Sequence, residues 1–228
     1  WKEGSPLIVI SKKTQEKVQK LVDIPVSLGM RYGKPSIEDG LKELSDNGVT
    51  EVFLMSLYPQ YAMSTTETVE VLAEDLIKQK FPDLNLTKLP PFYNKSDYIE
   101  NISAVILRDL ERFDYDCLLF SYHGLPERHL RKTDKTKKHK GKKFIDHEYC
   151  CQPGTAESEQ CYRTHCMETT RQIVEKIGIP KEKYALAFQS RLGVDKWITP
   201  YTADTVVELA KNGVKKLAVV TPAFVADC

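Results

Sequence analysis

The sequence predicts an α/β fold with parallel sheets, because short apolar runs alternate with amphipathic stretches along the chain. The run YDCLLFSYHG (115–124) is apolar almost throughout its first half, as expected of a strand buried on both faces. The stretch TTETVEVLAEDLIKQKF (65–81) has the residue spacing of an amphipathic helix. This alternation indicates parallel sheets with helices on both faces, arranged as two α/β units.

The remaining elements follow the same rhythm. We predict strands at 6–10, 24–30, 51–58, 84–89, 115–124, 184–190 and 215–224, and helices at 13–22, 36–48, 65–81, 96–113, 162–177 and 202–213. Ser36 and Asp39 resemble a capping box at the start of the 36–48 helix, and Gly48 is a stop signal at its end.

We place a domain boundary near residue 97, which gives an amino-terminal domain (1–96) and a carboxyl-terminal domain (97–228). A segment rich in lysine and cysteine, at about 131–161, interrupts the second domain. The chain starts and stops abruptly around strands, so we expect both domains to be incomplete and the chain to be part of a longer protein.

Composition excludes several classes of protein. The 228 residues carry a formal net charge of +1, so no overall field favours nucleic acid as a partner. No apolar run is long enough for a transmembrane helix, and the first residues do not resemble a signal peptide. We therefore expect a cytoplasmic protein with reduced thiols, and leave contact with a membrane surface open. The basic run RKTDKTKKHKGKKF (131–144) is interpreted as a solvated loop.

Four of the six cysteines fall within CCQPGTAESEQCYRTHC, namely Cys150, Cys151, Cys161 and Cys166. A disulfide framework is typical of small secreted chains, which this is not, so the window favours metal or cluster ligation. Four thiolates suit a [2Fe–2S] cluster, and tetrahedral Cys₄ coordination also suits zinc. Cys117 and Cys228 lie outside the window and are interpreted as packing residues.

In open parallel sheets, ligands bind beyond the carboxyl ends of the strands. His123 follows one strand and could act near neutral pH as a base or a metal ligand. Arginine, aromatic, amide and hydroxyl side chains follow the other strands: Arg31, Tyr32, Tyr58, Gln189, Ser190, Trp197 and Phe224. Aromatic residues at several strand ends suggest a large, flat, apolar ligand. Neither a GxGxxG nor a Walker sequence is present, which weighs against a nucleotide.

Six stretches in order carry a resemblance to a known family: GSPL (4–7), MRYGKP (30–35), LYPQYAMSTT (57–66), SYHGLP (121–126), FQSRLGVDKWITPYT (188–202) and PAFVADC (222–228). Through them the chain resembles the ferrochelatases, over essentially all of its length apart from the insertion. The resemblance implies two similar doubly wound, Rossmann-like (chelatase-like) α/β domains with a porphyrin in the cleft between them. It also implies that ferrous iron is inserted into protoporphyrin IX as the last step of haem synthesis.

The resemblance assigns roles to single residues. His123 matches the active-site histidine, which is proposed to take pyrrole protons, to guide the iron, or both. Porphyrin contacts are expected from Arg31, Tyr32, Tyr58, Gln189, Ser190, Trp197 and Phe224. The family's essential glutamate lies a few residues beyond ADC, and this chain ends at Cys228. We therefore expect the 228-residue polypeptide itself to be inactive and its parent protein to be a chelatase.

The cysteine window is an insertion relative to simpler bacterial ferrochelatases. A smaller bacterial group resembles this chain in having four cysteines in an internal segment, which favours [2Fe–2S] over zinc. Two alternatives to a ferrochelatase stay open. One is another tetrapyrrole chelatase, such as a cobalt chelatase. The other is a non-catalytic iron–sulfur or porphyrin sensor with the same fold. Whether the porphyrin substrate is protoporphyrin IX or a more carboxylated one, such as coproporphyrin, is also left open. The oligomeric state is left open.

Overall fold

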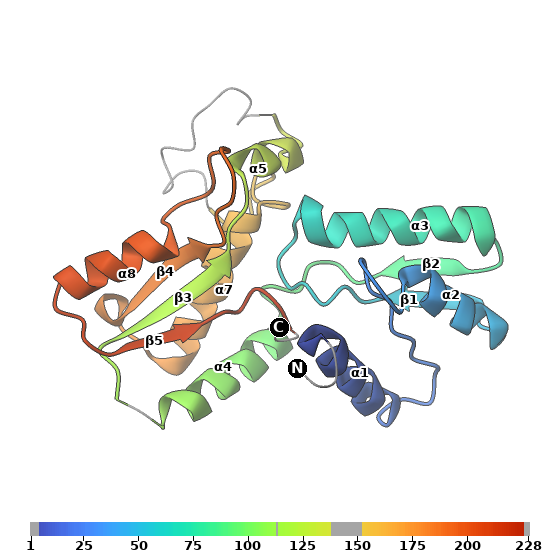
Figure 1. Ribbon diagram of the computed structural model, residues 1–228, viewed down its shortest axis with the longest axis horizontal. Helices are drawn as coiled ribbons and strands as arrows, with labels where there is room; N and C mark the ends of the chain where they lie inside the picture. The colour runs from blue at the N-terminus through green and yellow to red at the C-terminus, as the bar shows by residue number, and fades with distance from the viewer. Residues whose placement is uncertain (1–4, 113, 138–151, 226–228) are drawn as a thin grey trace. The chain divides into compact units, whose positions relative to one another are not determined.

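The computed structural model describes residues 5–112, 114–137 and 152–225 (Figure 1). The chain divides into two compact units. The first unit comprises Trp1–Tyr58, Met63–Pro90 and Phe224–Cys228, and the second comprises Pro59–Ala62 and Pro91–Ala223. The chain therefore passes between the units more than once. The predicted α/β class with parallel sheets is confirmed.

The first unit contains the helices α1 (Pro6–Gln19), α2 (Ile37–Asp46) and α3 (Thr68–Lys80), and a short π-helical turn, η1 (Met63–Glu67), precedes α3. Strands β1 (Glu51–Leu54) and β2 (Asn85–Lys88) pair in parallel, with Glu51 opposite Asn85 and Leu54 opposite Lys88. The core of this unit is formed by Ile37, Leu41, Val52, Val69, Ala73 and Leu84.

Helix α2 begins as its sequence predicts. The Ser36 hydroxyl accepts a hydrogen bond from the Asp39 N–H at 3.1 Å, and the Asp39 carboxylate accepts one from the Ser36 N–H at 2.7 Å. This reciprocal pair satisfies two backbone donors that a helix start would otherwise leave open. The capping box fixes the start of α2 from local sequence alone.

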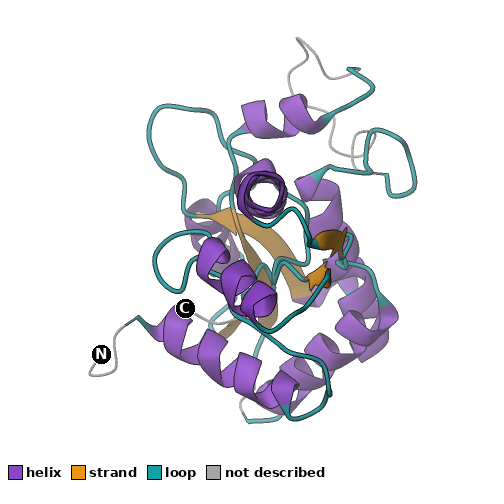
Figure 2. Cartoon of the chain, turned by 90° about the vertical axis from the view of Figure 1, so that its right-hand side faces the viewer, coloured by secondary structure: helices purple, strands orange, loops and turns teal. Residues whose placement is uncertain are grey.

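The second unit is larger. It contains α4 (Ser96–Leu110), β3 (Cys117–His123), α5 (Glu127–Thr133), α7 (Tyr162–Ile177), a 3₁₀ turn η2 (Lys181–Lys183), β4 (Tyr184–Gln189), α8 (Thr202–Lys211) and β5 (Leu217–Val220). The strands form a parallel sheet in the order β4-β3-β5. Figure 2 shows the elements by type, with short strands in orange among longer helices in purple.

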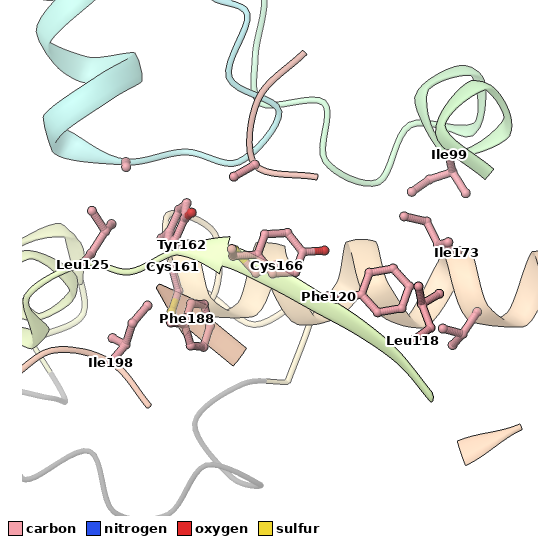
Figure 3. Packing of buried hydrophobic residues seen from close by; sticks show 14 of the residues in the cluster. Ile99, Leu118, Phe120, Leu125, Cys161, Tyr162, Cys166, Ile173, Phe188 and Ile198 are labelled. Carbon is pink, nitrogen blue, oxygen red and sulfur yellow. The ribbon is translucent and has the colours of Figure 1, made fainter. Parts of the chain in front are cut away.

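Strand β3 is the centre of this sheet, and its residues from Cys117 to Tyr122 are buried. Figure 3 shows Leu118 and Phe120 of β3 among buried side chains that include Ile173 of α7 and Ile99 of α4. Helix α4 packs against α7. Because β3 lies between two parallel neighbours and is covered by helices, its sequence is apolar without alternation, as predicted.

Two predicted strands are wrong. Residues 6–10 form the first turns of α1, because Pro6 is well suited to the first helical position and a five-residue apolar run does not distinguish helix from strand. Residues 24–30 join neither sheet, and Met30 at their end makes an isolated bridge with Ser36. The Gln15 side chain donates to the Val26 carbonyl at 2.7 Å, and Gln19 accepts from the Val26 N–H at 2.8 Å. These side chains occupy backbone groups that a strand partner would need.

The other predicted elements are present. The helix predicted at 13–22 begins seven residues earlier, at Pro6, and the remaining ends differ by up to four residues. None of the helices within the described residues combines the length and apolar character needed to span a bilayer.

Candidate functional site

His123 is the last residue of β3, at the carboxyl edge of the sheet in the second unit. It lies opposite Gln189, the last residue of β4, in the parallel ladder. The side chain of His123 is half-buried, and its backbone carbonyl accepts a hydrogen bond from the Tyr162 hydroxyl at 2.8 Å. Strand β3, buried along its length, thus ends in a half-buried imidazole, and Tyr162 of α7 holds the His123 backbone through its hydroxyl.

Gly124 lets the chain turn directly after His123. Its N–H donates to the Gln189 carbonyl at 2.8 Å. A Cβ at this position would lie 2.8 Å from that same carbonyl oxygen and 3.2 Å from Cε3 of Trp197. The backbone after β3 therefore approaches β4 and the Trp197 ring more closely than any residue with a side chain allows.

Three predicted site residues of the 188–202 motif lie around this turn. Gln189 ends β4, and Ser190 follows it with a φ of 68°, in the left-handed region that few non-glycine residues adopt. Trp197 pairs with Pro126 in an isolated antiparallel bridge, and its indole N–H donates to the Leu192 carbonyl at 2.8 Å. The fold thus brings His123, Gln189, Ser190 and Trp197 to one edge of one sheet.

Burial lowers the pKa of the His123 imidazole below its usual value. The imidazole is therefore neutral at neutral pH, which is the protonation state that accepts a proton or binds a metal ion. This arrangement can remove a proton from a ligand at the end of β3.

The buried carboxylate of Glu127 holds the loop after His123 in place through ion pairs. Glu127 begins α5, and its side chain is 5% exposed. It forms ion pairs with Lys196 at 2.8 Å and with Arg131 at 3.2 Å, and its N–H donates to the Lys196 carbonyl at 2.9 Å. The Ile198 N–H donates to the Leu125 carbonyl at 3.0 Å. The HGLPE and DKWI segments are thereby held side by side.

The other four predicted contacts lie in the first unit. The Arg31 guanidinium carbon lies 4.7 Å from the centre of the Tyr32 ring, and Arg31 Nε donates to the Thr68 carbonyl at 3.2 Å. Tyr32 is 74% exposed. Tyr58 and Phe224 meet edge to face, with ring centres 5.8 Å apart. These residues form two pairs, Arg31 with Tyr32 and Tyr58 with Phe224.

Of the cysteine window, Cys161 and Cys166 are described, and Cys150 and Cys151 lie outside the described residues. Cys161 caps the amino-terminal end of α7, and Cys166 lies in its second turn. Figure 3 labels both within the buried cluster of the second unit. Burial raises the pKa of the Cys166 thiol well above its usual value, and neighbouring Cys161 adds to the effect.

Two nearby thiols at the start of a helix are suitable donors for a soft metal or an iron–sulfur cluster. Within residues 5–112, 114–137 and 152–225, no group of three or more His, Cys, Asp or Glu side chains could hold a metal ion. A Cys₄ site at α7 would therefore need the thiols of Cys150 and Cys151.

Sequence reasoning missed three supports of this edge: the close approach at Gly124, the Tyr162 bond to the His123 carbonyl and the Glu127 ion pairs. Gly124 is visible in the SYHGLP motif as a possible turn residue. The Tyr162 bond depends on the packing of α7, and the Glu127–Lys196 pair joins residues some 70 positions apart, so no local pattern indicates either. The Glu127–Arg131 pair has i,i+4 spacing and is the one contact of this set that local sequence could indicate.

The chain is similar to known proteins over its whole length. A family model described as ferrochelatase matches residues 1–228. Proteins named ferrochelatase from Pseudomonas fluorescens (strain Pf0-1) and Stutzerimonas stutzeri (strain A1501) are 46% and 45% identical to it over 230 residues. Each comparison covers 100% of this chain and 66% of the relative, so the chain spans just under two thirds of their length. This chain belongs to the ferrochelatase family.

Proposed function

We propose that the intact protein is a ferrochelatase, a lyase that inserts ferrous iron into protoporphyrin IX in the last step of haem synthesis. The observation that carries this proposal is His123, a neutral, half-buried imidazole at the carboxyl end of β3 beside Gln189, Ser190 and Trp197. The full-length match to the ferrochelatase family supports it.

The chemistry needs a base. Two pyrrole N–H protons must leave the macrocycle as Fe²⁺ enters, so the reaction yields the iron porphyrin and two protons. His123 accepts a pyrrole proton through its lone pair, and because its pKa is lowered, it passes that proton on to water readily. His123 is also the group we assign to guide the substrate iron.

The porphyrin is a flat apolar ring with anionic propionates. In the second unit we assign porphyrin contact to Gln189, Ser190 and Trp197, whose indole supplies a flat apolar face. In the first unit we assign it to Arg31, which would bind a propionate carboxylate, and to Tyr32, Tyr58 and Phe224. The division into a 1–96 domain and a 97–228 domain remains part of this proposal.

The test is anaerobic iron insertion by the intact protein, followed as loss of porphyrin fluorescence. His123→Ala is expected to abolish insertion while leaving the melting temperature near that of the wild type. His129→Ala is the matched control, since His129 is also a partly buried histidine with a lowered pKa, six residues away on α5. Equal loss in both variants would contradict the role of His123.

The same assay separates the alternatives. Porphyrin binding without insertion of any metal would favour a sensor, and faster insertion of Co²⁺ than of Fe²⁺ would favour another chelatase. A preference for coproporphyrin would change the substrate but not the reaction. We propose a cytoplasmic location, with membrane-surface contact tested by co-sedimentation with anionic vesicles.

We also propose that Cys150, Cys151, Cys161 and Cys166 hold a [2Fe–2S] cluster, with zinc as the alternative. The support is the soft donor set and the closeness of Cys161 and Cys166 at the start of α7. When bound, the cluster would cross-link the inserted segment to α7.

A visible absorption spectrum of the anaerobically purified protein, with iron and zinc analysis, tests the cluster. Cys161→Ser is expected to remove the cluster absorbance. Cys117→Ser, a buried cysteine of β3 outside the window, is expected to keep it. Colourless protein with stoichiometric zinc would establish the zinc alternative.

A further inference from the structure

His165 lies on α7 between the two described cysteines, and it is completely buried. Its Nδ1 accepts a hydrogen bond from the backbone N–H of Tyr61 at 3.1 Å. Because Nδ1 accepts, the ring proton is on Nε2, which lies 3.1 Å from the Glu159 carbonyl oxygen and donates to it. Both ring nitrogens are therefore bonded to backbone groups, and the tautomer is fixed.

The flat face of the His165 ring also contacts another aromatic ring. The Tyr93 ring stacks on His165 with centres 3.7 Å apart and planes 7° from parallel. One turn further along α7, the Thr169 hydroxyl oxygen lies 2.9 Å from the carbonyl oxygens of both Tyr93 and His165, which share its single hydrogen. One face of α7 thus holds Tyr61 and Tyr93 around the His165 ring.

The segment held by this face is Pro59–Ala62, the middle of the LYPQYAMSTT motif. It belongs to neither a helix nor a strand, so its backbone depends on bonds from elsewhere. Gln60 Nε2 lies 3.2 Å from the Thr169 hydroxyl and 3.3 Å from the Pro222 carbonyl. The Phe92 N–H donates to the Pro59 carbonyl at 3.1 Å. These bonds fix the segment within the second unit.

The other hydrogen bond of His165 leads to the cysteine window. Glu159 is two residues before Cys161, within the turns that precede α7. One buried ring therefore joins the end of the inserted segment to the motif that contains Tyr58, a proposed porphyrin contact. Neither the iron chemistry nor the cysteine ligation assigned above uses His165.

We infer that His165 is a positioning residue that fixes the Tyr61 backbone, and with it the Pro59–Ala62 segment that follows Tyr58 in the chain, for porphyrin binding. This inference rests on the proposed function, because it is the porphyrin site that the segment serves. His165 acts through Tyr61 and does not touch porphyrin. The bond to Tyr61 is the essential one, and the bond to Glu159 holds the ring in place.

Two amide substitutions separate the two bonds. In His165→Asn, the side-chain oxygen takes the place of Nδ1 and can still accept from Tyr61 N–H. In His165→Gln, the amide nitrogen takes the place of Nε2 and can still donate to Glu159, but the Tyr61 bond is lost. We expect His165→Gln to raise KM for porphyrin roughly fivefold, the effect of one neutral hydrogen bond, with kcat little changed. His165→Asn should stay near the wild-type KM.

Backbone amide exchange, followed by NMR, supplies a readout that does not depend on activity. The Tyr61 amide is expected to be protected in the wild type and in His165→Asn, and to exchange faster in His165→Gln. Ile173→Val, a fully buried substitution two turns further along α7, is the stability control. It should lower the melting temperature without changing KM or Tyr61 exchange.

Equal KM values in the Gln and Asn variants, or a KM change of the same size in Ile173→Val, would overturn the positioning role. Fast exchange of Tyr61 in the wild type would also overturn it, without any variant having to fold. Failure of the wild-type protein to insert iron would instead contradict the proposed function, and the exchange of Tyr61 would still report on the hydrogen bond.

Discussion

Gly124 and Gln189 are in contact where β3 and β4 end: the Gly124 N–H donates to the Gln189 carbonyl at 2.8 Å, and no side chain fits between them. The contact extends the parallel ladder by one bond beyond His123. It therefore fixes the direction in which the chain leaves β3, and with it the backbone from which the His123 imidazole projects.

Replacing Gly124 should damage both fold and activity. In Gly124→Ala, the new methyl group meets the Gln189 carbonyl oxygen at 2.8 Å and Trp197 Cε3 at 3.2 Å, so the loop must shift at a cost of about 1–3 kcal/mol. Chemical denaturation measures that cost, and the insertion assay measures the accompanying loss of activity.

Gly213→Ala is the matched control for Gly124→Ala. Gly213 has a φ of 93° and no atom within 4 Å of an added Cβ, so alanine there costs about 1–2 kcal/mol of backbone strain without a clash. It should lower stability and leave iron insertion intact. Loss of insertion in Gly213→Ala would indicate that any destabilisation is enough to inactivate the protein.

Iron insertion should depend on pH through His123. Burial lowers the pKa of this group, and the neutral imidazole is the form that accepts a proton. Activity is therefore present at neutral pH and lost as the pH falls through the lowered pKa, with a midpoint below the usual histidine value of about 6.5. The pH profile of kcat/KM checks this. A midpoint above 6.5 would contradict the neutral-base assignment.

Substitutions at Ser190 can distinguish two roles of this residue: adopting a left-handed backbone conformation, and contacting porphyrin through its hydroxyl. Its φ of 68° suits glycine, so Ser190→Gly should change the free energy of unfolding by less than about 1 kcal/mol, whereas β-branched Ser190→Val should cost about 2 kcal/mol. If the hydroxyl binds porphyrin, Ser190→Gly raises KM without destabilising the fold. An unchanged KM in Ser190→Gly would remove Ser190 from the proposed porphyrin contacts.

The ion pair of Glu127 with Lys196 should contribute more to the free energy of unfolding than the nearby, more exposed pair of Arg128 with Asp195. The Glu127 side chain is 5% exposed, whereas Arg128 and Asp195 are 51% and 46% exposed at 3.0 Å separation. A double-mutant cycle on Glu127 and Lys196 should give a coupling energy of about 1 kcal/mol or more, and one on Arg128 and Asp195 should give less. Equal coupling energies in the two cycles would mean that the burial of Glu127 does not strengthen its ion pair.

Local sequence predicted several elements well. The capping pair Ser36 and Asp39 marks the start of α2, and the apolar run before His123 marks a strand buried between neighbours. The capping box can be predicted because its two residues are three positions apart. The strand can be predicted because burial on both faces requires apolar residues throughout. The prediction failed for residues 6–10 and 24–30, where a short apolar run fits more than one structure.

For the candidate site, the sequence determined the residue types: an imidazole after a buried strand, an amide and a hydroxyl after another, and an indole in the following loop. The parallel pairing of β3 with β4 decided that His123, Gln189, Ser190 and Trp197 share one edge of the sheet. The packing of α7 against the Pro59–Ala62 segment decided that His165, unremarkable in sequence between two cysteines, is bonded to Tyr61. Contacts between residues more than 60 positions apart depend on packing and strand register, which no local pattern encodes, so only the tertiary structure could assign them.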